Sequence, residues 1–116
     1  IPLINKNNNI QEALLIISEK GLGFTGVVND KNILIGIITD GDIRRTFEKG
    51  QNDLFNLNVE SIMTSTPRSI PTNTLAIKAL EIMEEHSITS LFVHNHNNPD
   101  ELRGVIHIHD ILNSGI

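Results

Sequence analysis

The sequence contains the same pattern twice, and this duplication limits the possible folds more than any other feature. The segment IQEALLIISE at residues 10–19 returns as AIKALEIMEE at 76–85, and LIGIITDGDI at 34–43 returns as LRGVIHIHDI at 102–111. A repeat unit of this size cannot bury its apolar face alone. We therefore expect the two copies to pack on each other about a pseudo-twofold axis, with two similar clefts between them.

Composition excludes several classes of function. The 116 residues carry a net charge of −5, which gives no basic field to attract nucleic acid, and four Phe without Trp or Tyr offer few base-stacking platforms. The absence of Cys excludes disulfides and thiolate metal sites and fits a reducing cytoplasm. No apolar run approaches membrane-spanning length, and no signal peptide is visible. We therefore expect a cytoplasmic domain without nucleic-acid or membrane partners, and the start at Ile1 rather than Met suggests a piece of a longer protein.

Each copy predicts the element order β-α-β-β-α, in an α/β (α+β) fold. In the first copy, Asn9 and Glu12 have the spacing of a capping box for a helix of about three turns that ends near Gly21. The other expected elements are a strand around Ile4, hairpin strands at residues 24–28 and 33–38, and a second helix that begins near Asp40.

The second copy predicts the same elements after a linker. They are a short strand at residues 67–70, a helix at 74–86, strands around 89–93 and 102–106, and a helix at 107–113. The second hairpin loop is predicted to be longer by two residues, and it holds Asn95, Asn97, Asn98, Pro99 and Asp100. Residues 50–58 are polar and Asn-rich, which predicts a surface linker. The expected organisation is a first repeat at 1–49, a linker at 50–66 and a second repeat at 67–116.

The string Gly36-x-x-Thr39-x-x-Asp42 has a chemistry that follows from its residue types. Gly36 lets the backbone approach a ligand, and the free N–H groups at the following helix start favour an anion. Thr39 offers a hydroxyl to a phosphate, and Asp42 can accept hydrogen bonds from ribose hydroxyls. The alternative is that Thr39 or Asp40 only caps the helix while Asp42 favours its positive end. The residues alone leave both interpretations open.

Two arginines and five histidines also have two interpretations each. Arg44 and Arg45 could add contacts to a phosphate or sugar acid, but Arg44 also lies four residues before Glu48, which suits an exposed helix pair. The histidines invite a metal interpretation, in the pairs His94 with His96 and His107 with His109, the latter beside Asp110. No set has a firm metal-ligand spacing, so we expect no metal site.

These features together resemble a known family. The duplicated unit, the junction SIMTSTP at residues 61–67 and the Gly36-x-x-Thr39-x-x-Asp42 string resemble a pair of cystathionine β-synthase (CBS) domains, a Bateman module, over nearly the whole chain. The strings GLG at 21–23, ITDGDIRR at 38–45 and HIHDIL at 107–112 are similar to the C-terminal regulatory region of bacterial arabinose-5-phosphate isomerases, which supply the precursor of the lipopolysaccharide sugar Kdo. The resemblance implies a catalytic domain N-terminal to this chain. The chain itself carries no nucleophile elbow or Walker-type loop and is not expected to be an enzyme.

The resemblance also implies that each cleft is completed by the other copy. The first cleft would be formed by Thr39, Asp40, Asp42, Arg44 and Arg45 together with Thr72, Ser87, Ile88 and Ser90. The second would be formed by His107, His109 and Asp110 together with Asn5, Lys6, Leu22 and Gly23. His107 stands where Thr39 stands in the first copy, and an imidazole changes charge near neutrality. The second cleft is therefore expected to prefer a different ligand, or to bind more strongly at lower pH.

The ligand and the partner follow as expectations. CBS pairs in general imply AMP or ATP, whereas an isomerase at the head of the Kdo pathway implies CMP-Kdo, whose carboxylate and phosphate match Arg44, Arg45 and Lys6. No cofactor is required. The alternatives are a structural dimerisation module with empty clefts, or an AMP- or ATP-sensing pair of another enzyme. Apolar helix faces predict a homodimer, namely Ile16, Ile17 and Phe47 in the first copy and Ile82, Met83 and Leu112 in the second.

Overall fold

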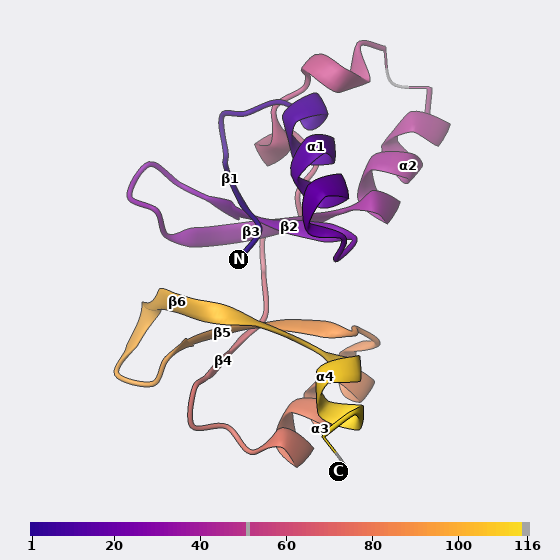
Figure 1. Ribbon diagram of the computed structural model, residues 1–116. Coiled ribbons are helices and arrows are strands. Elements are labelled where there is room, and N and C mark those ends of the chain that lie inside the picture. Colours follow the sequence, from indigo (N-terminus) through magenta and orange to yellow (C-terminus); the bar gives the residue numbers. More distant parts are fainter. Residues whose placement is uncertain (51, 115–116) are drawn as a thin grey trace. The chain divides into compact units, whose positions relative to one another are not determined.

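The first repeat folds in the predicted order. The computed structural model describes residues 1–50 and 52–114, and Pro2–Pro67 form one compact unit (Figure 1). Its elements are β1 (Leu3–Asn5), α1 (Ile10–Lys20), β2 (Phe24–Val28), β3 (Leu34–Thr39) and α2 (Asp40–Glu48), followed by the 3-10 turns η1 (Leu54–Asn56) and η2 (Val59–Ser61). The strand order is β1-β2-β3, with β1 parallel and β3 antiparallel to β2. The expected hairpin and helices are confirmed.

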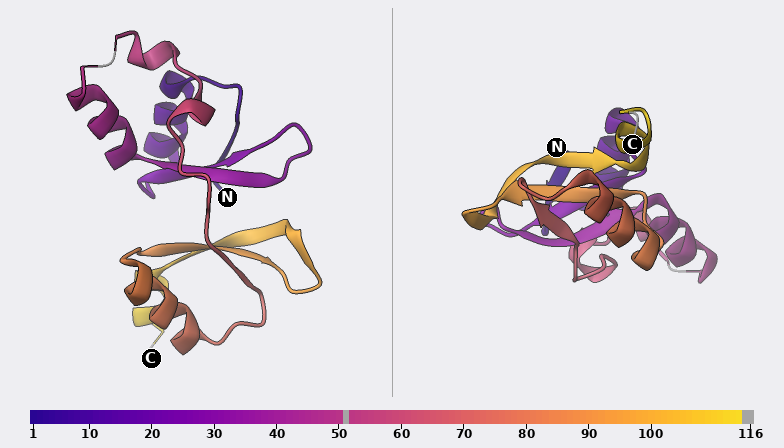
Figure 2. Two further views of the ribbon diagram at one scale, coloured as in Figure 1. Left: turned by 180° about the vertical axis from the view of Figure 1, so that it is seen from behind. Right: turned by 90° about the horizontal axis from the view of Figure 1, so that it is seen from below.

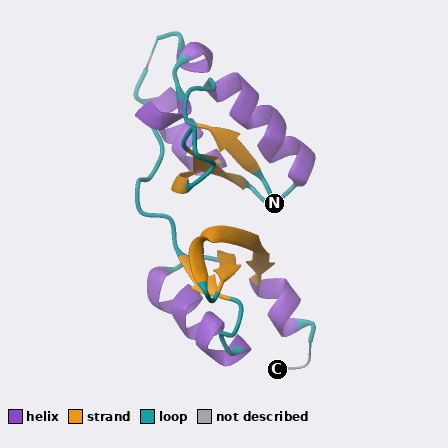
Figure 3. Cartoon of the chain, turned by 90° about the vertical axis from the view of Figure 1, so that its left-hand side faces the viewer, coloured by secondary structure: helices purple, strands orange, loops and turns teal. Residues whose placement is uncertain are grey.

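The second repeat, which begins at Arg68, has the same topology. Its elements are β4 (Ser69–Pro71), α3 (Ala76–His86), β5 (Ser90–Asn95), β6 (Asn98–His107) and α4 (Ile108–Leu112). The strand order is β4-β5-β6, with β4 parallel and β6 antiparallel to β5. Figure 3 shows that each unit consists of one small sheet with its helices. The β-α-β-β-α order is therefore confirmed for both copies.

The helix starts show where local sequence determines structure. The N–H of Glu12 donates to Oδ1 of Asn9 at 2.9 Å, and Gly21 ends α1 with a φ of 69°, so the capping box and the C-cap are both confirmed. The equivalent helix α3 begins at Ala76, two residues after the predicted start, and its N-cap residue Leu75 makes no side-chain cap bond. Because Leu has no acceptor, the first turn of α3 lacks the support that α1 has.

Each helix pair buries apolar residues against its own sheet. The first core contains Ile10, Ala13 and Ile17 of α1 with Val27 and Ile38 of the sheet. The second contains Ala79, Met83, Leu91 and Ile111. Ile17 and Met83 were expected on apolar surface left over for a second chain, and the structure shows this to be wrong, because both side chains are needed in the cores. Ile16 and Ile82 are half-buried, and Phe47 (66% exposed) and Leu112 (50% exposed) remain on the surface.

The segment expected to be a surface linker contributes to the first core. Leu54 is buried, and it joins Val59 in the cluster around α1. The N–H of Ile10 donates to the carbonyl of Leu57 at 2.9 Å, which ties the segment to the start of α1. Figure 2 shows the chain after residue 51, in pink, passing α1 and then reaching the sheet. The surface expectation is wrong for Leu54, because an apolar side chain in a polar stretch still finds a buried position.

The residues that follow this segment explain why position 36 is a glycine. Ile37 and Thr64 exchange two backbone hydrogen bonds of 2.9 and 2.8 Å, which lays residues 63–64 along β3. A Cβ on Gly36 would lie 2.9 Å from the Thr64 carbonyl oxygen and would overlap the Met63 side chain. The space that a side chain at residue 36 would need is therefore filled by the chain itself. This contact explains the glycine structurally, and the approach of a ligand to its backbone stays a prediction.

The second hairpin also differs from expectation. Asn95 pairs with Asn98, so the β5–β6 turn consists of His96 and Asn97, and the predicted longer loop is wrong. The extra residues lie in β6 instead, where the register shifts opposite His94 and Asn95. The Asn95 side chain accepts the N–H of Asn97 at 3.0 Å, which closes the tight turn. Among residues 1–50 and 52–114, no helix is long and apolar enough to cross a membrane.

Candidate functional site

The motif at the start of α2 forms a reciprocal cap. The N–H of Asp42 donates to Oγ1 of Thr39 at 3.0 Å, and the N–H of Thr39 donates to Oδ2 of Asp42 at 3.0 Å. This is the capping interpretation of the motif, in which one side chain satisfies each of two free helix donors. It uses one oxygen of the Asp42 carboxylate.

Arg45 uses the other oxygen. Its Nη2 lies 2.6 Å from Oδ1 of Asp42, and the side chain of Asp42 is 17% exposed while that of Arg45 is 62% exposed. A Cβ on Gly41 would lie 3.1 Å from Nη1 of Arg45, so a glycine leaves room for the guanidinium. A ligand hydroxyl that bonds to Oδ1 must share it with Arg45 or displace it. Arg44 is exposed, and no ion pair joins it to Glu48 in the part of the chain that the structure describes.

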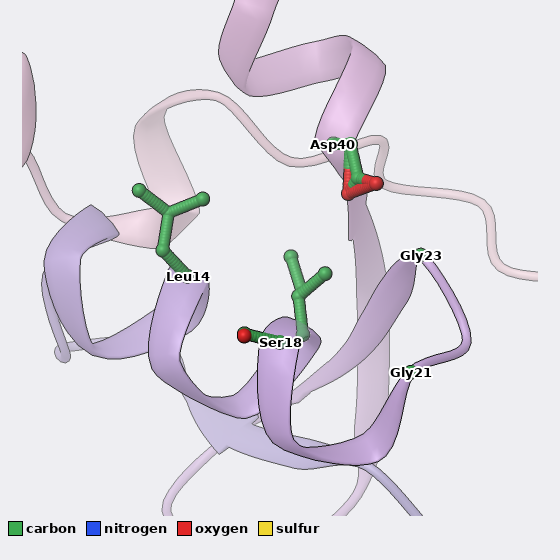
Figure 4. Close-up of a pocket in the computed structure, with 6 residues that line it drawn as sticks. Leu14, Ser18, Gly21, Gly23 and Asp40 are labelled. Atoms are coloured by element: carbon green, nitrogen blue, oxygen red, sulfur yellow. The ribbon is translucent and has the colours of Figure 1, made fainter.

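A pocket lies beside this cap, within the first repeat. It has a volume of about 380 Å³ and is open to solvent. Its lining residues are Leu14, Ile17, Ser18, Gly21, Gly23 and Asp40 (Figure 4). The N–H of Asp40 donates to the carbonyl of Gly23 at 3.0 Å, which joins the start of α2 to the loop after α1.

The pocket brings together residues that were predicted for different clefts. Gly23 was expected to complete the second cleft and Asp40 to belong to the first, whereas both line one pocket of the same repeat. The α1 residues that line it with them were not predicted. The helical spacing of Leu14 and Ser18, four residues apart, was a signal that could have found them.

The start of α4 repeats the box with different chemistry. Oδ2 of Asp110 accepts the N–H of His107 at 2.9 Å, as Asp42 does for Thr39. Nδ1 of His107 accepts the N–H of His109 at 3.1 Å, and the two imidazole rings stack with centroids 4.9 Å apart. The position equivalent to Arg45 is Asn113, so the Asp110 carboxylate has no arginine three residues further along. Oδ1 of Asp42 bonds to Arg45, whereas no arginine at the equivalent position bonds to Oδ1 of Asp110.

Ser90 is a polar group without a partner. Its Oγ is shielded from solvent and makes no hydrogen bond within the described residues. Ser90 lies directly opposite His107 in the β5–β6 pairing, and residues paired in this way have their side chains on one face of the sheet. The structure therefore places Ser90 beside a residue of the second predicted set, although it was predicted for the first cleft.

The remaining predicted residues have local contacts. Lys6 lies 4.0 Å from Glu60, Asn5 donates to Asp30 at 3.2 Å, and Leu22 is half-buried. In the second repeat Ser87 ends α3 with a φ of 54°, and the N–H of Ile88 donates to the Met83 carbonyl at 2.9 Å. Thr72 contacts Nδ1 of His96 at 3.1 Å. The grouping of these residues across the two repeats stays a prediction.

The histidines and carboxylates of the described residues do not gather into a metal-binding cluster. Within the ranges 1–50 and 52–114, no three side chains of His, Cys, Asp or Glu are grouped so that they could hold a metal ion. His94 instead contacts the Ser69 hydroxyl at 2.9 Å.

The duplicated fold and its paired helix-start motifs define a two-repeat α/β module. The chain belongs to the CBS domain family, whose model matches residues 1–49 and 59–115. Arabinose 5-phosphate isomerase KdsD of Yersinia pestis is 40% identical over 116 residues, which are 100% of this chain and 34% of that enzyme. The chain thus spans about a third of the length of such relatives.

Solved structures agree on the fold. A protein from Burkholderia ambifaria, described as a signal-transduction protein with CBS domains, matches with a TM-score of 0.85 and 29% identity, over 100% of this chain and 82% of that one. A CBS domain protein from Pyrobaculum aerophilum, complexed with AMP, matches with a TM-score of 0.82 and 22% identity, over 94% of this chain and 81% of that one. At 22% identity, the second comparison supports the fold alone.

Proposed function

We propose that this chain is the regulatory CBS pair of a sugar-phosphate isomerase that interconverts arabinose 5-phosphate and ribulose 5-phosphate for Kdo and lipopolysaccharide synthesis. The observation that carries the proposal is the 40% identity to KdsD along the whole chain. In this proposal the catalytic domain is N-terminal to Ile1, the full protein acts in the cytoplasm, and the chain senses a small molecule without turning over substrate. Purified chain should show no isomerase activity towards arabinose 5-phosphate.

The proposed ligand is a nucleotide or nucleotide-sugar, with CMP-Kdo preferred over AMP and ATP. Support comes from the Asp42–Arg45 pair, in which a carboxylate suited to ribose hydroxyls lies 2.6 Å from an exposed guanidinium. A ligand that carries both a ribose and an anionic group can bind Arg45 through the anion, which frees Oδ1 of Asp42 for the sugar. CMP-Kdo offers a carboxylate and a phosphate for this exchange. The Pyrobaculum protein, which has the same fold, is complexed with AMP, so AMP is included among the compounds to be tested.

We propose two ligand sites, one at the start of α2 and one at the start of α4. Thr72, Ser87, Ile88 and Ser90 are proposed to contact the ligand of the Asp42 motif, and Asn5, Lys6, Leu22 and Gly23 that of the Asp110 motif. The solvent-shielded Ser90 hydroxyl supports a ligand near the start of β5, because a buried hydroxyl without a partner costs free energy that a ligand hydrogen bond would recover. The exposed Phe47 and Leu112 support a homodimer through which ligand binding would act on the catalytic domains.

The test is calorimetric titration of CMP-Kdo, AMP and ATP into the parent chain, Asp42→Ala and Asp110→Ala. Asp42→Ala should remove binding at the first site and leave the second, while costing only about 1 kcal/mol of stability from the lost hydrogen bond to the Thr39 N–H. Asp110→Ala is the matched control, because it removes the equivalent carboxylate of the other repeat. Binding by Asp42→Ala at the parent level would refute the ribose role of Asp42. If none of the three compounds bound the parent or raised its Tm, a dimerisation module with empty clefts would be favoured.

A further inference from the structure

The start of α4 depends on a histidine in its neutral form. Nδ1 of His107 accepts the N–H of His109 at 3.1 Å. A neutral imidazole has one unprotonated nitrogen that can accept a hydrogen bond, whereas the charged imidazolium has an N–H on both nitrogens and accepts none. The bond therefore exists only while His107 is neutral and carries its proton on Nε2.

The groups around the ring determine what protonation does. On protonation, the N–H of Nδ1 would face the N–H of His109, and the stacked His109 ring, 4.9 Å away, could bring a second positive charge. Asp110 is the carboxylate of the box, but its Oδ2 is bonded to the backbone N–H of His107 rather than to the ring. From β5 the residue opposite is the uncharged Ser90, and α3, which packs against α4, carries His86 on its last turn. No salt bridge reaches the His107 ring within the ranges that the structure describes.

Two other histidines of the second repeat differ in this respect. Nδ1 of His94 contacts the Ser69 hydroxyl at 2.9 Å, and Nδ1 of His96 contacts the Thr72 hydroxyl at 3.1 Å. A hydroxyl can donate to a neutral imidazole or accept from a charged one, so these contacts persist in both states. Of these three contacts, only that of His107 requires a neutral ring.

The helix that this contact supports is short. α4 contains five residues and is held on the second core by Ile111, which is 2% exposed. A helix of about one turn has little stability of its own and depends on its cap and its packing. We infer that His107 makes the start of α4 a pH-dependent cap, which holds the helix on the second repeat when the imidazole is neutral and loosens it when the imidazole is protonated. The first repeat has no such dependence, because Thr39 occupies the same position.

The first experiment uses the parent chain. Nitrogen-15 NMR of the imidazole rings at pH 8 should show His107 with an unprotonated Nδ1 and a protonated Nε2. A ring protonated on Nδ1 at this pH would overturn the inference. Between pH 7.5 and 5.5, where histidines titrate and ordinary carboxylates do not, solvent protection of the amides of residues 109–111 should fall roughly fivefold to tenfold beyond the intrinsic pH effect, the size expected for one lost cap.

Substitutions test whether His107, and not another group, causes the pH response of α4. His107→Thr introduces the cap residue of the first repeat and should make the protection of α4 independent of pH, whereas His94→Gln should keep the parent's response. His109→Ala removes the stacked ring but keeps the backbone donor, so most of the response should remain. The same response in His107→Thr as in the parent, or equal losses at α2 and α4 in the parent, would overturn the inference. If His107→Thr fails to fold, the ring and exchange measurements on the parent decide.

Discussion

The two repeats share one topology but differ at three equivalent positions, two of which give the first repeat more internal support. The first helix of the first repeat starts with a complete capping box at Asn9, whereas α3 starts at Leu75 without a side-chain cap. The strand glycine of the first repeat is covered by residues 63–64, whereas a Cβ on Gly104 would meet no described heavy atom within 4 Å. Duplicated sequence thus preserves the path of the chain while the stabilising contacts diverge.

The third difference lies at the helix starts that carry the candidate site. In the first repeat the N-cap side chain is the uncharged hydroxyl of Thr39, and in the second repeat the imidazole of His107 replaces it. The two helix starts thus keep the same backbone geometry while their N-cap side chains differ in chemistry. Three pairs of substitutions test this comparison.

The largest effect is expected at the strand glycines. Gly36→Ala should lower the free energy of unfolding by about 1–3 kcal/mol, because the new methyl group must displace Met63 and the Thr64 backbone. Gly104→Ala should change it by less than about 0.5 kcal/mol, because the space there is open. Urea unfolding measures both values, and native-state hydrogen exchange assigns them to a repeat. Equal losses at the two glycines would contradict the asymmetry.

A smaller effect is expected at the starts of α1 and α3. Asn9→Ala should destabilise the first repeat by about 1 kcal/mol, because it removes the acceptor for the Glu12 N–H. Leu75→Asn should stabilise the second repeat by about 0.5–1 kcal/mol, because it adds an acceptor where α3 has none and removes an apolar side chain that is 73% exposed. Thermal unfolding of both variants checks the opposite signs. A loss of stability in Leu75→Asn would show that Leu75 has a packing role instead.

The smallest effect is expected at the ion pair. Arg45→Ala should reduce stability by less than about 0.5 kcal/mol, because the guanidinium is largely in solvent and exposed ion pairs contribute little. Asn113→Arg places an arginine three residues after Asp110, as Arg45 is three residues after Asp42. It should raise the free energy of unfolding by a similarly small amount. Differential scanning calorimetry at low and high salt separates the electrostatic part. A cost above about 1 kcal/mol for Arg45→Ala would mean that Arg45 has a structural role beyond the pair.

Much of the fold could be predicted because its signals are local. The Asn9 box, the Gly21 cap and the start of α2 at Asp40 involve residues within four positions of each other, so their spacing determines the contact. For the candidate site the same spacing identified Thr39 and Asp42. It left open whether they cap the helix or bind a ligand, and in the structure the capping bonds are formed.

Other features needed the three-dimensional structure. Ser90 and His107 are 17 residues apart, Gly36 and Met63 are 27 apart, and Leu54 joins α1 residues more than 30 positions earlier. No periodicity in the sequence reports contacts over such separations. The short β5–β6 turn was missed because a loop-length comparison assumes regular pairing, and here the register shifts within the strands.

The duplication, the β-α-β-β-α order and the residues that begin and end the main helices can be read from the sequence, because they depend on turn chemistry and on apolar spacing over a few residues. Three contacts are visible only in the folded chain. The Asp42 carboxylate is shared between a backbone N–H and Arg45, Gly36 is covered by residues 63–64, and Nδ1 of His107 accepts the N–H of His109. The sequence does not reveal these contacts because each group has several possible partners along the chain. Packing and hydrogen-bond geometry in the folded protein select the partner that each group contacts.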